Sequence, residues 1–310
     1  MKNIGIIGVG SLGQWHVKNY LELKDKVNVI GVVDNNEKRL EKICSQYSVK
    51  GFTDYKQLID KVDAVSIVTP TQYHYNIGKE FISKGIHCLV EKPITMNLAE
   101  AEELIRLAEQ NKVVLQVGHI ERFNPAVIEA QKYIKTPKFI EAYRVSPYDP
   151  RVSGIGVVLD MMVHDLDIIL FLLNSPVRDL QAYGAKVFSE HEDLVKVRIW
   201  FENGCIADIT ASRISPTKYR LTRIFQDDAY ISLNYMGQGL RIYRKKNREI
   251  KSMAEVDVIR PKIAKVNQLK IELSHFIDCV IEGKQPMVTG QHGRDAVELA
   301  LEILNKLQMM

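Results

Sequence analysis

A glycine-rich turn near the start of the chain constrains the fold more than any other feature. Residues 4–13 read Ile-Gly-Ile-Ile-Gly-Val-Gly-Ser-Leu-Gly, so an apolar run leads directly into a GxGxxG pattern. A helical pattern over residues 12–23 follows at once. We expect a buried strand, a tight turn and a helix packed closely on that strand, because glycine permits both the turn and the close approach. Such a unit typically opens a parallel sheet with crossover helices.

Alternating strand-like and helix-like segments continue this pattern through the first 118 residues. Short apolar runs predict buried strands, and the amphipathic segments between them predict helices. The predicted strands are residues 4–8, 27–33, 64–68, 87–90 and 113–117, and the predicted helices are residues 12–23, 37–47, 73–84 and 98–110. We therefore predict an α/β Rossmann domain with a doubly wound parallel sheet over residues 1–120.

The pattern changes after residue 118. The sequence predicts helices at 124–134 and 158–173, an extended segment at 139–146, and then strands at 181–188, 194–201, 205–212, 218–226, 230–234 and 240–243. Consecutive strands predict a largely antiparallel open sheet, with one face covered by helices and the other open to solvent or a second subunit. Two amphipathic helices close the chain. We predict an α+β domain over residues 121–310 for substrate binding and oligomerisation, and leave open that the closing helices pack back on the first domain.

Composition narrows the class of protein. The 310 residues exceed what one core usually supports, so two domains are expected. The formal net charge is +4 without a basic tract, which argues against nucleic-acid binding. Four cysteines lie far apart and predict buried free thiols in a reducing compartment, with no metal site. The first strand begins almost at Met1 and no apolar stretch could span a bilayer, so we expect a cytoplasmic protein without membrane contact.

The glycine turn predicts a dinucleotide site. Gly8 permits the turn, Gly10 admits a pyrophosphate, and Gly13 allows helix and strand to pack closely. Asp34 follows about 20 residues later, where its carboxylate suits ribose hydroxyls and repels a 2′-phosphate. NAD is therefore favoured, while Arg39 keeps NADP open. The residues expected to contact the cofactor are Gly8, Gly10, Ser11, Leu12, Gly13, Asp34, Asn35, Arg39, Thr69, Pro70, His74, Glu91 and Lys92.

Two further motifs predict proton chemistry. Lys92 lies in Glu-Lys-Pro directly after the predicted strand at residues 87–90, and Asp160 precedes His164 by one helical turn. Oxidation of a secondary alcohol needs a base for the hydroxyl proton while hydride leaves to a nicotinamide. Imidazole titrates near neutrality and suits that role, and a partly buried lysine is the alternative base. We expect Lys92, Asp160 and His164 to be catalytic and to contact the substrate.

Together, these motifs resemble the Gfo/Idh/MocA oxidoreductases over essentially the whole chain. The segments 118–125 (GHIERFNP) and 156–165 (GVVLDMMVHD) look most like the branch of UDP-N-acetylglucosamine 3-dehydrogenases. The resemblance implies that Lys92 contacts substrate and cofactor. It also implies NAD-dependent oxidation of a sugar hydroxyl, at C3 of UDP-N-acetylglucosamine in that branch. Action on a free sugar, inositol or other polyol is an alternative, and a non-catalytic nucleotide-binding regulator is a second.

The second domain should recognise the substrate. Besides the three catalytic residues, the expected contacts are Arg122, Asn124, Tyr148 and Arg151, with an arginine holding a diphosphate. A further basic set, formed by Arg213, Lys218, Arg220 and Arg223, is expected on a solvated or intersubunit face. The resemblance also implies a homodimer or homotetramer formed through the C-terminal sheet. The expected partners are thus a sugar or nucleotide-sugar and further copies of the chain.

Overall fold

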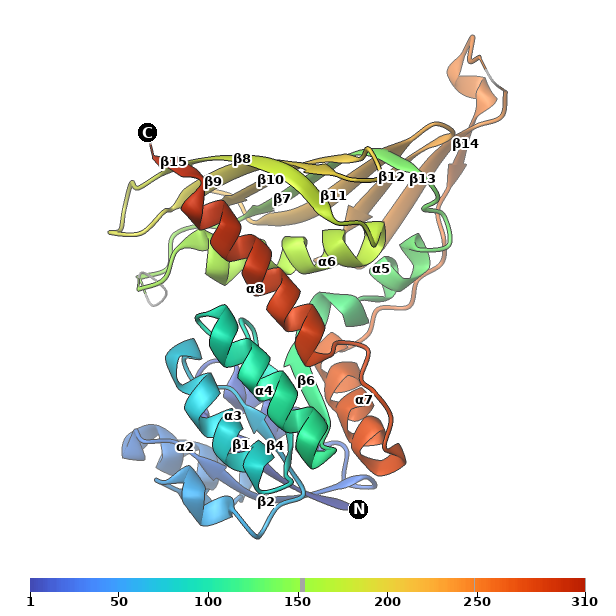
Figure 1. Ribbon diagram of the computed structural model, residues 1–310. Helices are drawn as coiled ribbons and strands as arrows, with labels where there is room; N and C mark the ends of the chain where they lie inside the picture. Colours follow the sequence, from blue (N-terminus) through green and yellow to red (C-terminus); the bar gives the residue numbers. More distant parts are fainter. Residues whose placement is uncertain (151–153, 248, 310) are drawn as a thin grey trace. The chain divides into compact units, whose positions relative to one another are not determined.

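The computed structural model describes residues 1–150, 154–247 and 249–309 (Figure 1). The chain divides into two compact units. The N-terminal unit holds residues 1–120 and 267–297, and the C-terminal unit holds residues 121–266 and the chain beyond 297. Within the described residues, no helix is long and apolar enough to cross a membrane. Three cysteines are buried and Cys44, contrary to expectation, is only half-buried; all four are free.

A six-stranded parallel sheet forms the centre of the N-terminal unit. Its strand order is β3-β2-β1-β4-β5-β6, the doubly wound arrangement that the sequence predicts. The strands are β1 (Lys2–Ile7), β2 (Val27–Val33), β3 (Gly51–Phe52), β4 (Ala64–Ile67), β5 (His87–Glu91) and β6 (Leu115–Gly118). Because all strands are parallel, their carboxyl ends meet at one edge, where the predicted cofactor residues follow β1, β2, β4 and β5.

Helices cover both faces of this sheet. They are α1 (Gly13–Leu21), α2 (Glu37–Tyr47), α3 (His74–Ser83), α4 (Leu98–Asn111), α7 (Gln268–Glu282) and the start of α8 (Gly290–Asn305), with short 3-10 turns η1 (Tyr55–Leu58) and η2 (Thr71–Tyr73). Asn97 caps α4 by accepting a hydrogen bond from the Glu100 amide. Helices α3 and α4 lie side by side (Figure 1), and α1, α2 and α7 share a separate core with β1.

A nine-stranded sheet forms the C-terminal unit, in the order β14-β13-β12-β11-β7-β10-β9-β8-β15. Its strands are β7 (Pro137–Val145), β8 (Val177–Ala185), β9 (Leu194–Phe201), β10 (Ile206–Ser212), β11 (Tyr219–Gln226), β12 (Ala229–Asn234), β13 (Gly239–Lys245), β14 (Val256–Ile259) and β15 (Leu307–Met309). Among the strands that the structure describes, only the β10–β7 and β15–β8 pairs are parallel, so the prediction of a largely antiparallel sheet is confirmed. Strand β8 lies about four residues earlier than predicted at its start.

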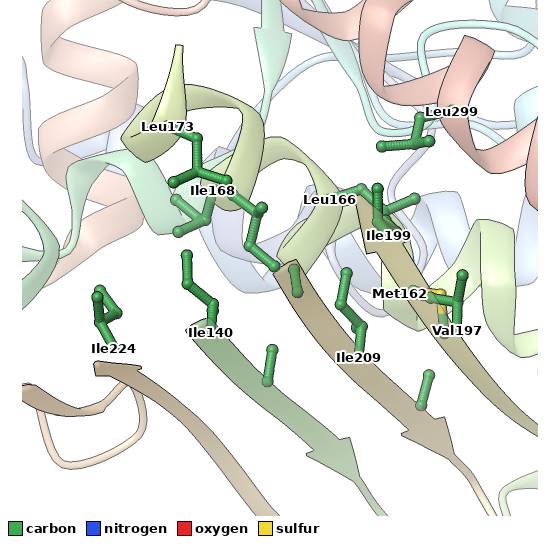
Figure 2. Packing of buried hydrophobic residues seen from close by; sticks show 14 of the residues in the cluster. Ile140, Met162, Leu166, Ile168, Leu173, Val197, Ile199, Ile209, Ile224 and Leu299 are labelled. Carbon is green, nitrogen blue, oxygen red and sulfur yellow. The ribbon is translucent and has the colours of Figure 1, made fainter. Parts of the chain in front are cut away.

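Helices cover one face of the larger sheet. The helical segments of the C-terminal unit are η3 (Ile120–Phe123), α5 (Pro125–Ala130), the π-helix η5 (Val158–Met162), α6 (Val163–Leu173) and the 3-10 turn η6 (Met253–Glu255). Figure 1 shows α5 and α6 on one side of the sheet. In Figure 2, Ile140, Ile209 and Ile199 from three strands point toward apolar side chains of α6, and all of these strand residues are fully buried. This packing fixes the helix that carries the predicted catalytic histidine.

The opposite face of the larger sheet carries an aromatic row. Phe139 lies 6.1 Å from Phe225, Phe225 stacks on Tyr230 at 5.1 Å, and Tyr230 stacks on Tyr243 at 5.4 Å between ring centroids. These four residues come from the neighbouring strands β7, β11, β12 and β13 and alternate with buried core residues. We call them the aromatic row.

Candidate active site

Each glycine of the turn after β1 has a distinct steric role. Gly8 has φ +90°, and a Cβ there would lie 2.7 Å from the Val68 carbonyl oxygen. A Cβ on Gly13 would lie 2.0 Å from the Gly8 carbonyl oxygen, so helix α1 packs directly on the turn. Nothing lies within 4 Å of a Cβ built on Gly10. The structure thus combines a closed turn with an open approach at its middle glycine, as pyrophosphate binding requires. Ser11 and Leu12 are exposed beside it.

Asp34 joins the end of β2 to the glycine turn. Its Oδ2 accepts a hydrogen bond from the Val9 amide at 3.0 Å. Arg39 donates to both carboxylate oxygens, through Nε at 2.9 Å and Nη2 at 2.8 Å. Burial opposes ionisation of Asp34, but the hydrogen bonds from Arg39, Asn36 and Val9 outweigh it and lower the pKa of Asp34. The carboxylate is therefore ionised and oriented where an adenosine ribose is expected, with Asn35 exposed next to it.

The segment after β4 contains a buried polar atom suited to a ligand. The Oγ1 of Thr69 is buried and has no hydrogen-bond partner among the described residues. A buried hydroxyl of this kind usually finds a partner, so the site fits a bound dinucleotide with a polar group at this point. Pro70 follows it and is exposed. Thr69, the open Gly10 and the ionised Asp34 together fit the expected NAD-type cofactor.

His74 holds two loops together. It is 1% exposed, with Nδ1 2.9 Å from the Pro93 carbonyl oxygen and Nε2 2.8 Å from the Thr69 carbonyl oxygen. Burial lowers the pKa of His74, while the two carbonyl contacts act in the opposite direction. Both ring nitrogens face backbone oxygens, so we do not retain the expectation that His74 contacts the cofactor directly. Its position instead ties the loop after β4 to the one after β5.

Glu91 supports the neighbouring Lys92 from inside the sheet edge. Glu91 is 7% exposed, its Oε1 lies 3.2 Å from His16 Nε2, and its Oε2 accepts from the Lys92 amide at 3.2 Å. Burial raises the pKa of Glu91, but His16 and Lys92 outweigh that effect and lower it overall. A Cβ on Gly118 would lie 2.8 Å from this carboxylate. Glu91 is thus enclosed by protein, so we replace its expected cofactor contact with a positioning role.

Lys92 follows β5 directly and is half-buried, and the peptide bond between Lys92 and Pro93 is cis.

The sequence reasoning missed His16, which lies on α1 and is fully buried against Glu91. One signal was available: His16 lies on the same helical face as Val17 and Tyr20, which read as core positions, and a buried histidine needs a polar partner.

In the C-terminal unit, Asp160 and His164 lie on consecutive helical segments. Asp160 belongs to the π-helix η5 and His164 to the first turn of α6, and both are half-buried. Single π turns frequently occur at functional sites because they change the aim of side chains within a helix. The start of η5 is fixed by Glu192, whose Oε1 accepts from the Val158 amide at 3.2 Å. The predicted pair therefore lies on a well-anchored helix.

Two buried ion pairs anchor α6 through Asp165 and Asp167. Arg144 donates to Asp165 through Nε at 2.7 Å and Nη2 at 3.0 Å, and its Nη1 lies 3.3 Å from Glu121. Arg122 donates to both oxygens of Asp167, with a shortest distance of 2.7 Å. Burial raises the pKa of Asp165, and Arg144 opposes that rise. The two aspartates next to His164 are therefore anchors of the helix.

Two residues expected to contact the substrate, Arg122 and Asn124, are instead engaged inside the C-terminal unit. The side chain of Arg122 is 2% exposed and fully engaged by Asp167, so we withdraw it as a phosphate ligand. Asn124 is fully buried, caps α5 by accepting from the Ala126 amide, and donates to Tyr235 and Glu121. Both residues build the scaffold of the C-terminal unit.

The remaining expected contacts lie near the loop before η5. Tyr148 is half-buried, and its hydroxyl donates to the Phe188 carbonyl oxygen at 3.4 Å. Arg151 lies outside the described residues. Arg213 was expected on a solvated face, which is wrong: its side chain is 1% exposed and its Nε donates to Asp193 at 2.6 Å.

Comparisons with known proteins agree with this geometry. Residues 2–119 match the family described as "Oxidoreductase family, NAD-binding Rossmann fold", and residues 136–232 match the "GFO/IDH/MocA C-terminal domain". A UDP-N-acetylglucosamine 3-dehydrogenase from Acidithiobacillus ferrooxidans is 32% identical over 300 residues, covering 96% of this chain and 95% of that protein. The chain belongs to the Gfo/Idh/MocA family of oxidoreductases.

Other members of the Gfo/Idh/MocA family are similar over nearly the full length. A solved structure of the Acidithiobacillus dehydrogenase matches with a TM-score of 0.91 at 31% identity. The match covers 99% of this chain and 97% of that structure's chain. The scyllo-inositol 2-dehydrogenase (NAD(+)) from Bacillus subtilis is 26% identical over 324 residues, covering 98% of this chain and 93% of that protein. The predicted family and fold are confirmed, and the protein is an NAD(P)-dependent oxidoreductase.

In this Gfo/Idh/MocA oxidoreductase, the candidate functional residues lie on two units, the N-terminal unit and the C-terminal unit. The N-terminal unit offers a dinucleotide cradle and a lysine fixed by a buried glutamate. The C-terminal unit offers a carboxylate and an imidazole on one anchored helix. By its chemistry, an imidazole or a lysine amine can accept the proton of a hydroxyl, and a carboxylate can accept a hydrogen bond from it.

Proposed function

We propose that this protein oxidises a secondary hydroxyl of a sugar with NAD as hydride acceptor. The observation that carries the proposal is the pairing, in one chain, of the Gly8–Gly13 cradle and Lys92 with Asp160 and His164 on an anchored helix. When bound, a nicotinamide supplies the acceptor for the hydride. The protein's own groups then have to orient the hydroxyl and remove its proton.

His164 and Lys92 divide that work in the proposed mechanism. His164 accepts the hydroxyl proton, because imidazole titrates near neutral pH. Lys92 donates a hydrogen bond to the same oxygen and stabilises the negative charge that develops there. Asp160, one turn before His164, orients the substrate or the imidazole. Glu91 and His16 hold the backbone of Lys92 in place through the contacts described above.

For the substrate, we propose UDP-N-acetylglucosamine, oxidised at C3 to the 3-keto sugar. The 32% identity over nearly the whole chain to a UDP-N-acetylglucosamine 3-dehydrogenase supports this choice. A free polyol is the second candidate, and the similarity to a scyllo-inositol 2-dehydrogenase favours it. NADH absorbance, followed with NAD and both substrates and with an aminotransferase to consume a keto product, distinguishes them. Turnover of inositol alone would exclude the nucleotide sugar.

For the cofactor, we propose NAD over NADP. The ionised Asp34 suits ribose hydroxyls and disfavours a 2′-phosphate. Arg39 is 45% exposed and paired with Asp34, so binding of a 2′-phosphate by Arg39 would disrupt this bidentate pair. Fluorescence titration should give a lower Kd for NADH than for NADPH. An Asp34→Ala variant should narrow that difference, since it frees Arg39 and removes the repulsive carboxylate.

We also propose that the chain forms a homodimer or homotetramer through the open face of the C-terminal sheet. The aromatic row supports this proposal, because it presents four half-buried rings on the face opposite the helices. Aromatic side chains are enriched at interfaces. Sedimentation of the wild type and of a Tyr230→Glu variant tests it, and a monomeric wild type would contradict it.

A further inference from the structure

Arg220 lies on the helix-covered face of the C-terminal sheet. It is the second residue of β11 and pairs in register with Arg144 of β7. Thr222 and Ile224, two and four residues further along, are fully buried. Strand alternation therefore places Arg220 on their side, and Figure 2 shows Ile224 on the side of the sheet that faces α6. Contrary to the sequence expectation, Arg220 belongs to the inner face.

The hydrogen-bonding capacity of Arg220 is largely unused. An arginine has five N–H donors, yet among the described residues Arg220 makes a single charged contact, Nη1 to Glu121 Oε1 at 3.6 Å, which exceeds hydrogen-bond distance. By contrast, Arg144 and Arg122 each donate to both oxygens of an aspartate. The side chain of Arg220 is 36% exposed. Its donors are thus available to a ligand.

Glu121 does not require Arg220 as its counter-charge. Its Oε1 already lies 3.3 Å from Arg144, and its Oε2 accepts from Asn124 at 3.2 Å. Burial and the like charge of Arg144 lower the pKa of Arg220, and the neighbouring carboxylates, Glu121 first, only partly offset the cost of burying this cation. A bound anion would relieve that cost.

Arg220 also lies within electrostatic reach of the catalytic helix. It pairs in register with Arg144, and Arg144 donates two hydrogen bonds to Asp165, the residue after His164 on α6. Asp160 is one of the residues assigned above to the substrate, and it lies in the same unit as Arg220. A ligand that contacts Arg220 would therefore lie close to the helix that follows Asp160 and carries His164.

We propose that Arg220 binds a phosphate or diphosphate group of the substrate, next to the helix that carries Asp160 and His164. The planar guanidinium matches phosphate oxygens with two parallel hydrogen bonds. The sequence leaves a phosphate-binding role open to Arg122 or Arg151; Arg122 is committed to Asp167, and in this proposal Arg220 takes the role. The inference rests on the proposed function and deepens it, because it explains how a nucleotide sugar would be preferred over a neutral polyol.

Arg220→Gln and Arg223→Gln form a matched pair of variants. Arg223 lies on the same strand but on the opposite face, where it pairs with Glu141 at 3.4 Å. Calorimetric titration of the full-length variants with UDP, UMP, inorganic phosphate and N-acetylglucosamine measures the affinity of each chemical group. We expect Arg220→Gln to raise the Kd of UDP roughly 10- to 100-fold, as for loss of a charge-assisted hydrogen bond. Arg223→Gln should leave it unchanged, with assembly checked by sedimentation.

The comparison of ligands identifies the source of the phosphate. A large effect on UDP with a small effect on inorganic phosphate supports a nucleotide diphosphate, and equal effects support any phosphorylated ligand. Arg220→Lys retains the charge but not the fork, so it should lose part of the affinity and keep the fold if Arg220→Gln unfolds. With UDP-N-acetylglucosamine, KM should rise for Arg220→Gln while kcat changes little.

Two results would overturn the inference. The first is an equal Kd of UDP for Arg220→Gln and Arg223→Gln. The second is a wild-type protein that binds no phosphate-containing ligand, which would also exclude the nucleotide-sugar substrate. Arg220-dependent binding of UDP without oxidation of UDP-N-acetylglucosamine would support the inference while contradicting the proposed reaction, so the two failures can be told apart.

Discussion

Removing the positive charge of Arg144 should destabilise the protein in a pH-dependent way. Asp165 is 1% exposed and is held by two hydrogen bonds from Arg144. In an Arg144→Met variant, the buried carboxylate would lose its counter-charge, and breaking buried pairs in this manner typically costs about 3–5 kcal/mol. Asp165 can limit the loss by taking up a proton when the protein folds.

The free-energy cost of protonating Asp165 sets an upper limit on the destabilisation of Arg144→Met. The ordinary pKa of an aspartate is 3.8, and each pH unit above it costs about 1.4 kcal/mol. At pH 7 the limit is therefore about 4 kcal/mol, and at pH 5 it is about 2 kcal/mol. The sign follows from the raised pKa of the folded state: protonated Asp165 is tolerated in the folded state, so the variant regains stability relative to wild type as the pH falls.

Urea unfolding of wild type and Arg144→Met at pH 7 and pH 5, followed by circular dichroism, measures this difference. We expect a loss in the free energy of unfolding of about 3–4 kcal/mol at pH 7 and about half of that at pH 5. A double variant, Arg144→Met with Asp165→Leu, should recover much of it, because no buried charge remains on that pair. A loss below about 1 kcal/mol, or one equal at both pH values, would refute the reasoning.

Three further predictions concern the glycine turn, the proposed catalytic residues and the buried Arg122. Gly13→Ala places a Cβ 2.0 Å from the Gly8 carbonyl oxygen, so urea unfolding should show a free energy of unfolding lower by about 1–3 kcal/mol. Gly10→Ala meets no such neighbour, so the free energy of unfolding should stay unchanged. Fluorescence titration should show that Gly10→Ala weakens only NADH binding. Lys92→Ala and His164→Ala should each lower kcat roughly 10²–10⁴-fold with NADH affinity retained, and wild-type turnover would remove that residue from the mechanism. Arg122→Met should destabilise by about 3–5 kcal/mol without raising KM in the folded fraction; a raised KM with normal stability would restore it as a substrate ligand.

Local patterns were sufficient to predict most elements of the fold. Helix α2 and strands β2 and β9 begin and end where the sequence predicts, because amphipathic periodicity, a capping asparagine and strand alternation all act within a few residues. Strand β8 ends at Ala185, before the predicted end at residue 188, because Asp193 accepts hydrogen bonds from the amides of residues 187–189 and holds them in a turn. A carboxylate several residues away thus ends a strand that its own residues would continue.

Site residues were harder to predict because their partners lie far apart in sequence. The partner of Arg122 is 45 residues away and that of His16 is 75 residues away. Neither separation follows from periodicity, so an arginine that reads as a phosphate ligand turns out to be half of a buried pair. The glycine turn was predictable because its strand, turn and helix are contiguous.

Arg220 and Arg223 show why the face of a strand is difficult to assign from the sequence alone. Each face of β11 presents one arginine with apolar or small neighbours, Thr222 and Ile224 on one side and Leu221 and Phe225 on the other. Side-chain alternation has a period of two, so a shift of one residue in register exchanges the two sets. The register with β7 decides the matter by placing Arg220 opposite the buried Arg144. Which arginine can meet the substrate is therefore a consequence of strand pairing, and the comparison of Arg220→Gln with Arg223→Gln tests that register as well as the proposed phosphate site.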